Sequence, residues 1–219
     1  RFGDKADVRD ILMDDLRLPV DARQILVVKV SRALSDMPMV KALIGSARAE
    51  RITREAVVRA SLDLIDECGA DEHAALVEHL RLSGALTTAF VLRVMVHGKI
   101  GFLATILAAL SSQDEDRIKA QLAGGRVAVL TALFSRCGFT SSVGSILVHA
   151  LDCWRDVANG RLNAGPQEIA RMLLEFLGAD ARTPSFAYGN DDIVGLIRSI
   201  YLETIRENGR RHALSIQAA

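Results

Sequence analysis

Apolar residues recur about once per helical turn along most of this chain. Ile169, Met172, Leu173 and Phe176 occupy positions i, i+3, i+4 and i+7 of one helix face, and a longer stripe of the same kind runs through Val143–Val157. No segment sustains the strict apolar and polar alternation that a half-buried strand requires. The pattern therefore predicts an all-α protein.

The best strand candidate is the β-branched run Ile25–Val30. Polar residues around it, including Gln24, Lys29 and Ser31, fall where a helix with one buried side would place them. We therefore expect this run to be helical.

Proline and glycine indicate where the helices begin and end. Proline in the first helical turn loses no needed hydrogen bond, and glycine allows the left-handed conformation that often ends a helix. Three prolines mark expected starts and five glycines expected ends: Pro19, Pro38, Pro166, Gly45, Gly69, Gly98, Gly138 and Gly178. The predicted helices are Gly3–Asp15, Val20–Ser35, Pro38–Ile44, Thr53–Cys68, Glu72–Leu82, Thr87–His97, Ile100–Leu110, Asp114–Leu122, Val127–Cys137, Ser142–Asn159, Pro166–Leu177 and Asp191–Asn208.

A faint internal repeat suggests how these helices are organised. Val91 and Leu92 ahead of Gly98 resemble Val129 and Leu130 ahead of Gly138, an offset of roughly 40 residues, which is in the range of two-helix repeats. We expect a HEAT-like α-solenoid of stacked antiparallel helix hairpins, with an irregular helical bundle as the alternative. Residues 1–70 would form N-terminal hairpins, and residues 71–219 a helical array continuous with them.

Charge and cysteine content narrow the function classes. Lys plus Arg and Asp plus Glu are equal at 27 each, so no overall field attracts the chain to nucleic acid or to an anionic membrane. The 3 cysteines form no close pair, which favours reduced thiols and a cytoplasmic location. No signal peptide precedes Phe2, and because an initiator Met is missing we expect the natural chain to continue upstream of Arg1.

The most apolar stretch, Leu86–Leu110, is long enough to be tested as a membrane span. Arg93, His97 and Lys99 lie near its middle, and Gly98 interrupts it. Charges at that depth are costly in a bilayer, so a buried helical hairpin is the better interpretation.

The same stretch resembles a known family. Leu86–Leu110 and Ile118–Phe139 look like the bacterial domain of unknown function 2336, a group of HEAT-like helical proteins. The similar positions are Leu86, Thr87, Leu92, Arg93, His97, Gly98, Phe102, Leu107, Leu110, Leu122, Leu130, Phe134, Gly138 and Phe139. The resemblance implies an α-solenoid fold and brings no catalytic residues with it.

One cluster has the chemistry of a metal site. His149, Asp152, Cys153 and Asp156 fall on or beside the polar side of a predicted helix, with His149 and Cys153 spaced i and i+4. Four such groups would supply metal ligands, whereas the competing interpretation is a solvated polar face with a half-buried thiol. Because no second ligand pair at metal-site spacing exists elsewhere, we favour the polar face and expect no cofactor.

Four further residues are candidates for binding. Arg93 lies in a helix that is apolar nearly all round, so it either pairs with an internal carboxylate or lines a groove. His97 either caps the carbonyl end of that helix or binds an anion. Phe186 and Tyr188 lie in a predicted loop, where aromatic residues anchor a loop or contact a partner.

The sequence contains no nucleophile elbow, HExxH, CxxC or Rossmann glycine motif. We therefore expect a non-catalytic scaffold or regulatory module that binds another protein or a second copy of itself, without membrane contact. The alternatives are a nucleic-acid-binding helical repeat, because Arg outnumbers Lys and a basic run ends the chain, and a sensor of a metal or small molecule.

Overall fold

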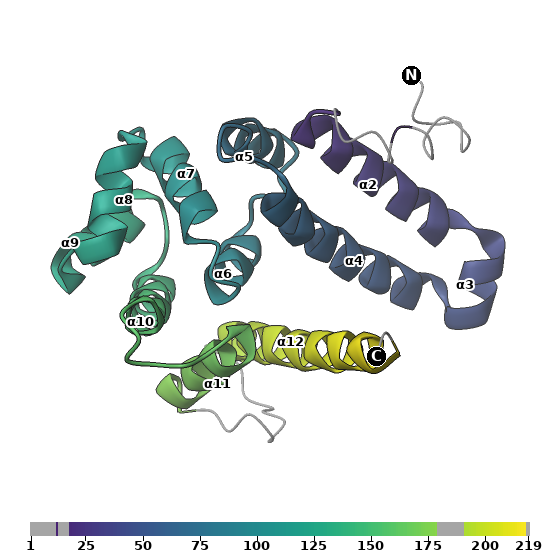
Figure 1. The fold of residues 1–219 in the computed structure, drawn as a ribbon. Helices are drawn as coiled ribbons and strands as arrows, with labels where there is room; N and C mark the ends of the chain where they lie inside the picture. The colour runs from purple at the N-terminus through teal and green to yellow at the C-terminus, as the bar shows by residue number, and fades with distance from the viewer. Residues whose placement is uncertain (1–11, 13–17, 179–190, 218–219) are drawn as a thin grey trace. The chain divides into compact units, whose positions relative to one another are not determined.

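The computed structural model describes residues 12, 18–178 and 191–217, whose helices are drawn in Figure 1. Every regular element in these ranges is a helix, which confirms the all-α prediction. Of the expected helix 3–15, all residues except residue 12 lie outside the described ranges. The helices are α2 (Val20–Asp36), α3 (Pro38–Ile44), α4 (Ser46–Glu67), α5 (His73–Leu82), α6 (Thr88–Val96), α7 (Ile100–Ser111), α8 (Glu115–Gly124), α9 (Val127–Arg136), α10 (Ser141–Ala158), α11 (Pro166–Phe176) and α12 (Asp191–Gln217).

The chain forms two compact units, Arg1–Leu86 and Thr87–Ala219. We describe each unit by itself. The boundary expected at residue 70 stays a prediction, although α5 lies beyond it and packs on α2 within the first unit.

The first unit is built on the antiparallel pair α2 and α4, which the short helix α3 joins at one end (Figure 1). The run Ile25–Val30 lies within α2, as predicted. A buried polar pair fixes the alignment of the two helices, because Gln24 Nε2 donates to Ser61 Oγ at 2.8 Å. One turn before Gln24, at the end of the pair away from α3, the Val20 amide donates to the Glu72 carboxylate.

Two helices are longer than the apolar pattern predicted. α4 begins at Ser46 rather than at Thr53, and α12 runs to Gln217 rather than to Asn208. The added turns contain Ala and Arg, which favour helix without marking an apolar face. The apolar periodicity therefore missed these turns. They are helical because their residues favour helix and because each turn continues a helix that is packed elsewhere.

The second unit is organised around α6, which contacts α7, α10, α11 and α12. Six of its nine residues are buried, as expected for a helix that is apolar nearly all round. Trp154 of α10 joins this core by donating its indole N–H to the Met95 carbonyl at 2.7 Å. The stretch tested as a membrane span is thus the hairpin of α6 and α7.

Three turns in this unit confirm the role predicted for glycine. Gly98, Gly138 and Gly178 follow α6, α9 and α11 with φ of +71°, +87° and +69°. Gly69 was predicted to end α4 in the same way, and this was wrong. Cys68 already ends that helix in an extended conformation, so Gly69 needs no positive φ.

Among the residues that the structure describes, no helix combines the length and the apolar character that a membrane crossing needs.

Candidate functional site

Arg93, a predicted binding residue, forms an ion pair between α6 and α12. Its Nε and Nη2 donate to the two carboxylate oxygens of Glu203 at 3.2 and 3.0 Å. Ser199 also donates to this carboxylate, at 2.9 Å. The planar guanidinium and the planar carboxylate thus form two parallel hydrogen bonds, which is the strongest arrangement for this pair of groups. Arg93 therefore holds α12 against α6 and does not line a groove.

The other predicted binding residues have different surroundings. His97 is the C-cap residue of α6 and is half-buried, at the carbonyl end where a capping histidine was expected. Phe186 and Tyr188 lie outside the described residues. The structure therefore shows Arg93 in an interhelical ion pair and His97 at a helix end, and it describes neither aromatic candidate.

The residues considered as metal ligands each have another partner or are buried. Asp152 pairs with Arg155 at 3.0 Å, and Asp156 pairs with Arg161 at 2.9 Å. His149 stacks on the ring of Phe176, with centroids 4.3 Å apart, and Cys153 is buried. Within the described ranges, no three His, Cys, Asp or Glu side chains are grouped closely enough to hold a metal ion.

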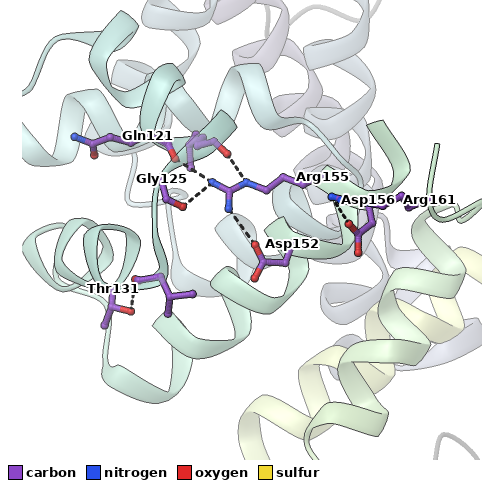
Figure 2. Close-up of polar contacts among 9 residues, drawn as sticks. Gln121, Gly125, Thr131, Asp152, Arg155, Asp156 and Arg161 are labelled. Atoms are coloured by element: carbon purple, nitrogen blue, oxygen red, sulfur yellow. Dashed lines mark hydrogen bonds and ion pairs between the residues drawn. The ribbon is translucent and has the colours of Figure 1, made fainter. Parts of the chain in front are cut away.

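Arg155 gathers an unexpected set of contacts in this region (Figure 2). Its guanidinium donates to the carbonyls of Gln121, Leu122 and Gly125, at 3.1, 2.9 and 3.2 Å, and also contacts Asp152. These carbonyls lie at the C-terminal end of α8, where the helix dipole favours a cation. Arg155 therefore caps α8 from α10. Spacing along the chain could not reveal this, because the partners lie on another helix.

The cysteine thiols are poor nucleophiles and poor metal ligands in this fold. Burial raises the pKa of Cys137 to about 11. It also raises the pKa of Cys153, where the nearby carboxylates of Asp156 and Asp152 act in the same direction. Cys68 has a raised pKa as well, again chiefly because of burial. Since the thiolate is the reactive form, all three thiols stay protonated near neutral pH.

The first unit presents the clearest candidate for a functional surface. α3 has no buried residue, although four of its seven residues are large and apolar. Met39 and Leu43, spaced i and i+4 on one side of this helix, are 68% and 76% exposed. We call the exposed apolar side chains on and beside α3 the tip face: Leu34, Met37, Met39, Leu43 and Ile44.

A groove lies beside the tip face between α2 and α4. Its volume is about 350 Å³. It is open to solvent and combines two valines with two arginines, hydroxyl groups and one carboxylate: Val28, Ser31, Arg32, Ser35, Glu50, Thr53, Arg54 and Val57. Such a mixed lining offers apolar contact together with charged groups for orientation.

Charge is unevenly distributed along the same helix pair. Residues 29–59, which include α3, contain seven Lys or Arg and three Asp or Glu. Residues 60–72, at the other end of α4, contain five Asp or Glu and no Lys or Arg. The equal totals of the whole chain thus conceal a basic surface around the tip face.

Sequence reasoning predicted the helix 38–44 but missed this surface. Two Met residues around Pro38 and the basic excess of residues 29–59 were the available signals. Neither distinguishes an exposed apolar helix from a buried one, because an apolar face is present in both cases. Only the packing of α3 shows that no other described helix covers its apolar side.

Comparison with known proteins gives one finding. A family described as "Uncharacterised protein conserved in bacteria (DUF2336)" matches residues 1–184. No curated protein and no solved structure matches the chain.

Proposed function

The chain belongs to the DUF2336 family, as the resemblance in its sequence predicted, and we propose that it is a non-catalytic module that binds another protein through the tip face. The observation that supports this proposal is the exposure of α3, a helix without a buried residue, with Met39 and Leu43 as its most exposed apolar side chains. Clustered apolar side chains at a surface gain free energy when a partner covers them.

The chemistry elsewhere in the chain is consistent with a binding role. Arg93 and Arg155 hold helices together, and the cysteine thiols are kept in their protonated form. We also propose a cytoplasmic location, since free thiols are typical of reducing compartments.

For the second unit, we propose that the pairs α6–α7 and α9–α10 stack as HEAT-like repeats. Contacts of α6 with α10 and of α7 with α9 support this arrangement, as does the positive φ shared by Gly98 and Gly138. In this proposal α11 and α12, which both contact α6, close the stack. An experimental structure in which the two pairs did not superpose would refute the repeat.

The function is tested by crosslinked co-purification of the full chain from the native cell. The test variant is Met39→Asp/Leu43→Asp, and the matched control is Leu82→Asp, because Leu82 is 71% exposed in the same unit but lies outside the tip face. We expect one protein to be recovered in stoichiometric amount with wild type and with the control, and to be lost with the test variant. Recovery of a metabolite or nucleic acid in its place, or of no partner, would refute the proposal.

A further inference from the structure

The arginines beside the tip face are available to a partner. Arg32, Arg48, Arg51 and Arg54 are exposed, and none forms an ion pair with another described residue. At the opposite end of the α2–α4 pair, Arg23 contacts both Glu67 and Glu72. At the tip end Lys41 pairs with Asp36 at 2.9 Å, whereas these four arginines have no carboxylate partner among the described residues.

Apolar and cationic groups lie together on this surface. The groove has Val28 and Val57 in its lining, together with Arg32 and Arg54, and it lies next to the exposed turns of α3. Methionine side chains such as those of the tip face adapt to irregular apolar surfaces, which is why they are common where helices are bound. An apolar groove flanked by cations is complementary to a helix with one apolar face and acidic flanks.

From this complementarity we propose that the tip face and the α2–α4 groove bind an acidic amphipathic helix of a partner protein. Apolar side chains of that helix would enter the groove and cover Met39 and Leu43, while its carboxylates would meet Arg51 and Arg54. This inference rests on the proposed function and specifies the chemistry of the partner.

The same features argue against two other occupants. A second copy of this chain, related by a two-fold axis, would place the basic tip opposite itself, and like charges would repel. A flat anionic membrane surface would not fill a groove, and it would oppose Glu50, which is part of the groove lining. Both occupants can be distinguished from a helix by experiment.

The experiment is a selection from a displayed library of 18-residue helices, carried out on the purified full-length chain. The apolar positions of one helix face are held as Leu, and the flanking positions are randomised among Glu, Lys, Ser and Gln. We expect Glu to be enriched on the flanks. A synthetic peptide of the selected sequence should bind more weakly as salt rises, because exposed ion pairs are screened.

Matched variants then locate the binding site. We expect Leu43→Asp and Arg51→Glu/Arg54→Glu each to weaken peptide binding by about tenfold or more, as loss of a central interface residue does. Leu82→Asp should bind like wild type. Circular dichroism checks that each variant keeps the helical content of wild type, which the exposure of these positions favours.

Several results would overturn the proposal. These are enrichment of Lys on the flanks, no enrichment, or equal binding by Leu43→Asp and wild type. Salt-dependent binding to phosphatidylserine vesicles without peptide selection would indicate a membrane surface, and a dimer that Leu43→Asp dissociates would indicate a second copy. If co-purification recovers a partner through the tip face but its contacting segment is not an acidic helix, this inference fails while the proposed function stands.

Discussion

Replacing Gly98 by Ala tests the packing at the centre of the second unit. Gly98 turns the chain between α6 and α7 with φ of +71°, and a Cβ built there lies 2.9 Å from Cζ2 of Trp154. An alanine in this left-handed conformation costs about 1 kcal/mol relative to glycine. The contact with the indole ring adds roughly 1–3 kcal/mol, the usual cost of overpacking, because the hydrogen bond to Met95 holds the ring in place.

Gly138→Ala is the matched control. Its φ is +87°, but a Cβ added there meets no atom within 4 Å, so only the backbone term of about 1 kcal/mol applies. Gly98→Ala should therefore lower the unfolding free energy by about 3 kcal/mol, corresponding to a Tm roughly 6–12 °C lower. Urea unfolding followed by the fluorescence of Trp154, the chain's only tryptophan, reports the second unit directly.

A double-mutant cycle separates the two contributions. In a Trp154→Phe background the ring atoms nearest to the added Cβ are absent, so Gly98→Ala should cost no more than Gly138→Ala. Circular dichroism replaces fluorescence for these variants. Equal destabilisation by Gly98→Ala and Gly138→Ala in the wild-type background would refute the argument that the indole ring restricts this turn.

The other predictions concern polar groups of the second unit. Arg93→Met should lower stability by about 1–2 kcal/mol, less than for a fully buried pair because Glu203 is partly exposed, and Arg93→Met/Glu203→Met should recover most of the loss in urea unfolding. Arg155→Met should lower the free energy of unfolding by about 2–3 kcal/mol, because the α8 carbonyls lose a charged donor. A decrease below about 0.5 kcal/mol, which is typical of an ordinary surface substitution, would contradict the capping role. The pKa of Cys137 is about 11 in the folded state, above its unfolded value of 9.0. The buried neutral thiol therefore contributes fully to the stability of the fold below pH 9, and this contribution is lost as pH rises toward 11. The stability difference between wild type and Cys137→Ala should accordingly shrink over that range in urea titrations, and an unchanged difference would show that the thiol is not held neutral.

Much of the local structure was predictable because it depends on neighbouring residues. The helical nature of Ile25–Val30, the hairpin of Leu86–Leu110 and the turns at Gly98 and Gly138 all follow from periodicity and backbone preference. Helix ends were less predictable, as the early start of α4 at Ser46 shows. There, helix-forming residues extend the element without contributing to an apolar stripe.

The candidate site was predicted less well than the fold. His149 and Asp156 were singled out for their chemistry, and each contacts a residue that does not belong to the suggested cluster. Arg93 was correctly expected to need a carboxylate, but its partner Glu203 lies on a helix far along the chain. Side-chain chemistry indicates that a partner is required, whereas tertiary contacts select which one.

The sequence by itself determined that this chain is helical, where most of its helices lie and which family it belongs to, because these properties depend on the spacing of residue types along the chain. Only the tertiary structure decided which apolar faces are buried. The apolar side chains of α6 lie in a core, and those of α3 remain at the surface beside a basic groove. The two helices have similar side-chain chemistry, and the difference arises because burial depends on which helices pack around each one.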